Sequence, residues 1–130
     1  MRYHHIGVAC RDLEKEQLWY VGVLGYQPEG EGFADPLQGI RGRFLINGGT
    51  RIELLEALPG SDVLAPWLQR GMTLYHLAFE VSGLEAAIDR LAVSRTRLVS
   101  PPKPAVAFDG RQVAFCMGPN LLLIELIESA

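Results

Sequence analysis

Two histidines and two glutamates of this chain are of the types and in the places that a metal ion would require: His5, Glu53, His76 and Glu125. Each glutamate lies among aliphatic residues of a predicted strand, and burying a carboxylate is costly unless a positive charge accompanies it. A divalent cation bound by two imidazoles and two carboxylates supplies that charge. Mixed nitrogen and oxygen ligands suit Zn, Ni, Co, Mn or Fe(II) rather than Ca. An octahedral ion with four protein ligands keeps two positions for water or a bidentate substrate.

The four residues belong to a tandem duplication of the sequence. The segment HIGVA at residues 5–9 recurs as HLAFE at residues 76–80, which is 71 residues later (76 − 5). The segment IELLE at residues 52–56 recurs as IELIE at residues 124–128, 72 residues later (124 − 52). Phe44 and Phe115 are a further equivalent pair. Two modules that each supply one imidazole and one carboxylate predict a metal site on a pseudo-twofold axis.

A structural alternative assigns no chemistry to these residues. Glu53 and Glu125 would then pair with Arg41, Arg43 or Arg51, and the histidines would be satisfied core residues. For one residue alone this alternative is favoured, because a single histidine or glutamate in a strand is weak evidence of a site. The duplication reverses the preference, since the alternative must then hold four times at equivalent positions. By position, we expect Glu80 to form a salt bridge and Glu56 and Glu128 to be solvated.

Length and composition indicate one compact domain. The 130 residues are 48% hydrophobic, which is enough for a core shared by both modules. The net charge is −3 and the basic residues are scattered, so a nucleic-acid partner is not expected. The apolar runs are too short to cross a membrane, and the N-terminus does not resemble a signal peptide, so we expect a cytoplasmic protein. Cys10 and Cys116 are expected to be buried, reduced thiols.

Each module is predicted to begin with a strand and a helix and to continue with three shorter strands. Asp12 and Gly25 should begin and end a helix over residues 13–24, and Ser82 with Glu85 should cap a helix from Gly83 to about residue 93. The predicted strands are 3–10, 26–29, 40–46, 51–56, 74–81, 97–99, 112–117 and 121–128. Residues 30–38 and 100–109 should form loops. Module one covers about 1–58 and module two about 73–130, and the linker 59–72 contains a short helix over 61–70.

Strand alternation predicts which side chains share a face of the sheet. If Ile52, Leu54, Ile124 and Leu126 face the helices, the four metal-binding candidates turn to the opposite face, which we call the ligand face. Gly7 and Ala78 follow each histidine by two residues and are small enough to leave room there. Along the third strand, Arg41 and Arg43 alternate with Phe44 and are therefore expected on the ligand face. From the second module, Gln112 and Cys116 are expected beside them.

These segments together resemble the vicinal oxygen chelate superfamily, which includes glyoxalase I, methylmalonyl-CoA epimerase, extradiol dioxygenases and bleomycin-resistance proteins. The resemblance spans nearly the whole chain and is carried by 5–14, 23–26, 52–56, 76–81 and 124–128. It implies an α+β fold in which two tandem βαβββ modules form one open, barrel-like sheet, a homodimer, and a metal site formed by His5, Glu53, His76 and Glu125. Residues 39–40, 52–56 and 110–115 are most similar to the epimerase branch. Where that branch carries a glutamate, this chain has Leu37 and Gln38.

The expected function is that of a divalent-metal-dependent isomerase or lyase, either epimerase-like or lactoylglutathione-lyase-like. It would act on a small carbonyl substrate through an enolate or enediolate, with Glu125 moving the proton. Arg41, Arg43 and Gln112 are the expected substrate-binding residues. The alternative is a non-catalytic protein of the same fold that binds an antibiotic or another small molecule. An extradiol dioxygenase is a weaker option, because a fourth protein ligand leaves too little room for catechol and oxygen. The sequence leaves the substrate and the metal's identity open.

Overall fold

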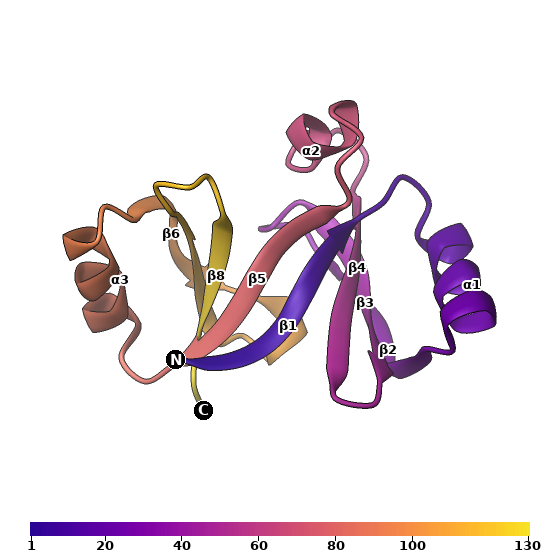
Figure 1. Cartoon of the computed structure of the whole chain (residues 1–130), viewed down its shortest axis with the longest axis horizontal. Coiled ribbons are helices and arrows are strands. Elements are labelled where there is room, and N and C mark those ends of the chain that lie inside the picture. The colour runs from indigo at the N-terminus through magenta and orange to yellow at the C-terminus, as the bar shows by residue number, and fades with distance from the viewer. The chain divides into compact units, whose positions relative to one another are not determined.

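Figure 1 shows the computed structural model, which describes residues 1–130. The fold is α+β, with two tandem βαβββ modules as predicted; the strand order is β2-β3-β4-β1 in the first module and β5-β8-β7-β6 in the second. The elements are β1 (Arg2–Ala9), α1 (Leu13–Leu24), β2 (Gln27–Asp35), β3 (Ile40–Asn47), β4 (Thr50–Ala57), α2 (Ala65–Gln69), β5 (Leu74–Val81), α3 (Leu84–Val93), β6 (Arg97–Pro104), a 3-10 turn (Val106–Phe108), β7 (Gln112–Met117) and β8 (Leu123–Glu128).

The chain divides into two compact units. The first unit is His5–Tyr75, and the second is Met1–His4 together with His76–Ala130. In the first unit β1 pairs with β4 in parallel, and β4, β3 and β2 follow in antiparallel order. In the second unit β5 pairs with β8 in parallel, and β7 and β6 follow in antiparallel order. Each unit therefore closes its own module by pairing the first strand with the last. That the two form one domain stays a prediction.

A carboxylate from the last strand of each module lies at the start of that module's helix. The α1 boundaries are those predicted: the Asp12 carboxylate accepts from the Lys15 N–H, and Gly25 takes a left-handed conformation at the end. The Leu13 N–H donates to Glu56 at 2.9 Å. In the second unit the Gly83 N–H donates to Glu128 at 3.0 Å, and the Leu84 N–H also donates to this carboxylate.

Two of the sequence predictions for these helix starts are therefore wrong. The N-cap of α3 is Gly83, and no side-chain capping bond forms there, so the expected box of Ser82 and Glu85 is absent. Glu56 and Glu128 were expected to be solvated, yet both bind backbone N–H groups that would otherwise lack partners.

The core of each unit lies between its helix and one face of its sheet. In the first unit Leu13 packs with Val8, Leu45, Ile52 and Leu54. In the second unit Leu84 and Ala87 pack with Val81, Ala114, Cys116 and Leu126. The predicted helix-side position of residues 52, 54, 124 and 126 is confirmed. Cys10 and Cys116 are buried, free thiols, as expected, and burial raises the pKa of Cys10 to about 12.

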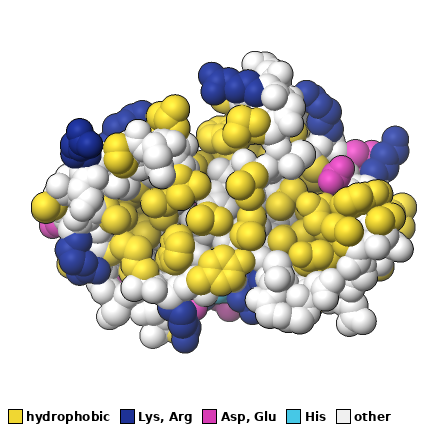
Figure 2. All heavy atoms as spheres, viewed as in Figure 1, with side chains coloured by type: hydrophobic (Ala, Val, Ile, Leu, Met, Phe, Trp, Pro, Cys, Tyr) yellow, Lys and Arg dark blue, Asp and Glu magenta, His cyan; other side chains and the backbone are white.

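The two segments predicted as loops, 30–38 and 100–109, are largely strand, and only residues 36–38 and 105–109 lie outside strands. Residues 30–35 continue β2, and residues 100–104 continue β6. Both are outer strands with register shifts, which accommodate glycine and proline at positions where regular pairing would not. Figure 2 shows hydrophobic side chains gathered over α1, where Leu18, Trp19 and Val23 are exposed. Helices long and apolar enough to span a membrane are absent.

Candidate functional site

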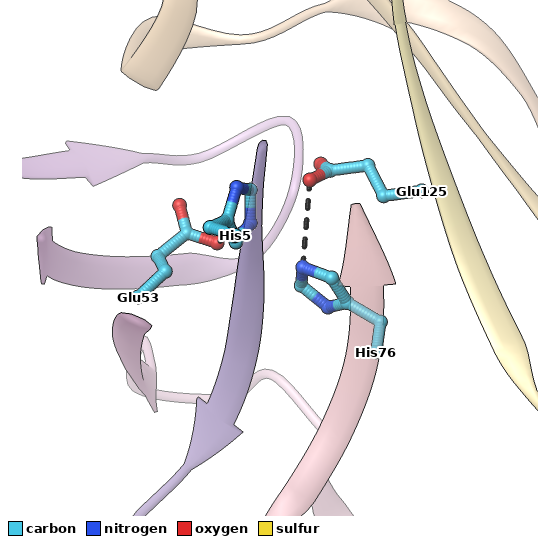
Figure 3. A group of neighbouring side chains, drawn as sticks. All are labelled: His5, Glu53, His76 and Glu125. Atoms are coloured by element: carbon cyan, nitrogen blue, oxygen red, sulfur yellow. Dashed lines mark ion pairs between the residues drawn. The ribbon is translucent and has the colours of Figure 1, made fainter. Parts of the chain in front are cut away.

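The first unit brings His5 and Glu53 together on adjacent parallel strands. His5 lies on β1 and Glu53 on β4, and the His5 Nε2 and Glu53 Oε1 atoms are 3.1 Å apart (Figure 3). His5 is 0% exposed and Glu53 is 4% exposed. Gly7 is the register partner of Glu53, so the position beside the carboxylate carries no side chain, as predicted. An imidazole nitrogen and a carboxylate oxygen are thus held close together away from solvent.

The second unit repeats this arrangement with His76 and Glu125. His76 lies on β5 and Glu125 on β8, and the His76 Nε2 and Glu125 Oε1 atoms are 3.4 Å apart (Figure 3). His76 is 1% exposed and Glu125 is 5% exposed. Ala78 is the register partner of Glu125. The two pairs use the same imidazole nitrogen and the same parallel strand pairing, so the duplication seen in the sequence extends to atomic positions within each unit.

An aromatic ring stands against each histidine. In the first unit the Phe44 and His5 rings are 5.2 Å apart at 79°, and in the second unit the Phe115 and His76 rings are 5.4 Å apart at 78°. Phe44 is the register partner of Glu53, and Phe115 is the register partner of Glu125. Both rings therefore lie on the ligand face of their unit. The sequence match between these phenylalanines was visible, but alternation had placed Phe44 on the helix side.

The predicted positions of Arg41 and Arg43 are wrong for the same reason. Arg43 is the register partner of Leu54, which packs in the helix-side core, and Arg41 shares that face. The Arg41 Nε donates to Glu56 at 2.6 Å and its Nη2 donates to Glu14 at 2.6 Å. The Arg43 Nη2 donates to the Gly30 carbonyl at 2.9 Å. A role of either arginine in substrate binding stays a prediction without support from its position.

The expected ligand-face positions of Gln112 and Cys116 are also wrong. Phe115 is opposite Glu125, so Gln112, Ala114 and Cys116 alternate to the other face of β7. Cys116 is buried in the core beside α3, and Gln112 is exposed at the start of the strand. The substrate-binding role of Gln112 likewise stays a prediction.

Several other carboxylates are committed to arginines. Hydrogen bonds from Arg41 lower the pKa of Glu56 and of Glu14. Glu80 accepts from Arg2 at 2.6 Å and from Arg111 at 3.1 Å, and these bonds lower its pKa. The predicted salt bridge of Glu80 is confirmed. These groups carry full negative charge at neutral pH and are occupied by fixed partners.

The chemistry of the donor set fits a divalent cation. Each of the four residues is buried and offers one metal-binding atom. Of the arginines that the structural alternative assigned to Glu53 and Glu125, Arg41 binds Glu56, Arg43 binds the Gly30 carbonyl, and Arg51 binds Glu29 at 2.7 Å. Two imidazoles and two carboxylates are suitable ligands for Zn and for the neighbouring transition metals.

Comparison with known proteins finds one family and a consistent group of relatives. Residues 4–115 match the Glyoxalase/Bleomycin resistance protein/Dioxygenase superfamily. The mitochondrial methylmalonyl-CoA epimerase of Bos taurus is 30% identical over 135 residues, covering 98% of this chain and 74% of that protein. The ethylmalonyl-CoA/methylmalonyl-CoA epimerase of Cereibacter sphaeroides is 29% identical over 116 residues, covering 88% and 86%. The crystal structure of methylmalonyl-CoA epimerase from Mycobacterium tuberculosis has a TM-score of 0.84 at 32% identity, covering 99% and 88%.

Proposed function

The chain belongs to the glyoxalase/bleomycin resistance protein/dioxygenase superfamily, and from that premise we propose that it is a divalent-metal-dependent isomerase of acyl-CoA thioesters. Its relatives include epimerases of methylmalonyl-CoA and ethylmalonyl-CoA. The observation that carries the proposal is the pair of buried His–Glu contacts, one in each unit, between equivalent residues. The proposed reaction moves a proton at the carbon next to the thioester carbonyl.

His5, Glu53, His76 and Glu125 would together hold one cation, with Zn, Ni, Co, Mn or Fe(II) as candidates. When bound, the cation supplies positive charge that stabilises the negative oxygen of an enolate. The small residues Gly7 and Ala78 lie beside the two glutamates and would leave room for the substrate carbonyl. Buried carboxylates without a cation would be costly, which makes metal binding and stability parts of one prediction.

Glu125 is the proposed base. It accepts the proton from the substrate carbon, and the electron pair of the C–H bond moves into the enolate. Its Oε1 lies 3.4 Å from the Nε2 of the paired histidine. Inversion also requires a proton for the opposite face of the enolate. Leu37 and Gln38 are not acids, so we infer that water or another side chain delivers that proton.

The test measures metal content and proton transfer in the same samples. Protein stripped with a chelator is reloaded with one metal at a time, and solvent deuterium uptake by methylmalonyl-CoA is followed by mass spectrometry. We expect exchange in the reloaded wild type, and we expect it to be faster than inversion. Glu125→Gln should slow exchange roughly 10²- to 10⁴-fold. Glu85→Gln, in the first turn of α3, is the matched control and should exchange like the wild type.

Two results would contradict the proposal. The first is a wild type that takes up none of these metals. The second is a reloaded protein that binds the thioester without exchange, in the wild type and in Glu125→Gln alike, which would favour a small-molecule-binding protein of the same fold.

A further inference from the structure

We infer that Phe44 and Phe115 are positioning residues, which fix the two histidines in the orientation that binds metal. This inference rests on the proposed metal site and adds two residues that act through the ligands. Its basis is the match between the two units. The ring separations differ by 0.2 Å (5.4 − 5.2) and the interplanar angles by 1° (79 − 78).

Each phenylalanine is held by the strand next to its glutamate. Phe44 on β3 lies opposite Glu53 on β4, and Phe115 on β7 lies opposite Glu125 on β8. The histidine is on the strand beyond the glutamate, so each ring reaches across its carboxylate's strand to an imidazole. The same three-strand arrangement occurs in both units.

The rings restrict a motion that the ligand contact alone leaves open. The second side-chain torsion of histidine has a broad, shallow preference, so an imidazole can turn its Nε2 away from the site. A ring standing nearly perpendicular at 5.2 Å or 5.4 Å blocks that rotation through edge contacts. In both units the histidine ring is oriented so that its Nε2 faces the paired glutamate. An apolar ring beside a ligand also limits water access to it.

The first unit supports its ring more closely than the second unit does. Phe33 packs against Phe44 with ring centroids 6.0 Å apart. Gly42 makes room for it, because a Cβ there would lie 2.8 Å from the Phe33 ring. Phe115 instead lies opposite Ser100, which is small. We therefore expect the His76 ring to take a wider range of orientations after the loss of Phe115 than the His5 ring takes after the loss of Phe44.

The test measures metal binding rather than turnover. Phe44→Leu and Phe115→Leu keep an apolar side chain and remove the ring, and Phe44→Tyr keeps the ring. Dissociation constants for Zn and Co(II) are measured by competition with a chromophoric chelator, and the visible absorption of the Co(II) protein reports ligand geometry. Each leucine variant should bind the metals roughly 3- to 10-fold more weakly than the wild type and should shift the Co(II) spectrum. Phe44→Tyr should keep the affinity and the spectrum of the wild type. Trp19→Leu, which removes a half-exposed ring from α1, is the control.

The outcomes distinguish this inference from the proposed function. A wild type that binds neither metal overturns the metal site itself. A wild type that binds them, with leucine variants of equal affinity and identical spectra, overturns only the positioning role. If a leucine variant fails to fold, spectra of the histidine rings in the metal-free wild type still test the positioning role. With three histidines in the chain, long-range nitrogen–proton spectra resolve each ring. His5 and His76 should each show one ring state before metal is added, and averaged rings would overturn the inference.

Discussion

Glu56 and Glu128 are equivalent residues whose carboxylates each bind the start of a helix from the far end of a module. Glu56 accepts from the Leu13 N–H across 43 residues of sequence, and Glu128 accepts from Gly83 across 45. Negative charge at a helix N-terminus is also favoured by the helix dipole. Glu56 additionally binds Arg41, so it joins β3, β4 and α1 in one hydrogen-bonded group.

Replacing Glu56 with Gln should lower the free energy of unfolding by about 1–2 kcal/mol at neutral pH, because the helix N-terminus and Arg41 lose a charged partner. Arg41 lowers the pKa of Glu56 below its ordinary value of 4.5. The contribution of Glu56 to stability is therefore complete above pH 4.5. It is lost as the pH falls through the lowered pKa that Glu56 has in the folded state.

Urea unfolding of the wild type and Glu56→Gln at a series of pH values checks this prediction. The difference between them should be largest near pH 7 and should shrink in acid, while Glu85→Gln should follow the wild type throughout. A difference that does not change with pH would mean that the charge of Glu56 contributes nothing.

Some elements could be predicted from local signals and others could not. The α1, β5 and β7 boundaries follow from caps and from short apolar runs, and the structure confirms them. The β3 strand has apolar residues on both faces, so alternation alone did not decide between Phe44 and Leu45 as the core residue. Leu45 is 0% exposed and faces the helix. The positions expected for Arg41 and Arg43 depended on that choice.

The candidate site was partly predictable for a related reason. Its histidines and glutamates lie on the first and last strands of each module, where aliphatic neighbours define the alternation clearly. The phenylalanines lie on the middle strands, where the pattern is ambiguous. The helix-binding roles of Glu56 and Glu128 depend on contacts between residues more than 40 positions apart, which no local pattern predicts.

Gly42 on β3 has no room for a side chain. A Cβ would lie 2.8 Å from the Leu54 carbonyl oxygen and 2.8 Å from the Phe33 ring. Gly42→Ala should therefore destabilise the protein by about 1–3 kcal/mol, because backbone and ring must both move. Gly49→Ala, in open space in the following turn, is the control. Thermal unfolding measures both, and equal melting temperatures would show that β3 adjusts freely.

The molecule as a whole is not divided where the sequence duplication divides it. Met1–His4 group with the second unit, although they begin the first module. Arg2 binds Glu80 at 2.6 Å, and the Tyr3 ring packs edge-on against Phe79 at 6.3 Å. The first half of the chain thus contributes part of the packing surface of β5.

Tyr3→Ala should loosen the second unit more than the first. Removing the ring leaves Phe79 without that packing partner, and we expect faster amide hydrogen exchange in β5 and β8 than in the wild type. Exchange in β3 and β4 should change little. Hydrogen exchange with mass spectrometry resolves the two units. An equal increase of exchange in both units would contradict the grouping of Met1–His4 with the second unit.

During synthesis, Met1–His4 are made before residues 76–130, which contain their packing partners. Residues 5–75 contain every strand that their own sheet requires, so they can fold while synthesis continues. Met1–His4 therefore cannot take up their packing until residues 76–130 have been made. Mutations that slow translation of residues 76–130 should lengthen the interval in which Met1–His4 lack that packing.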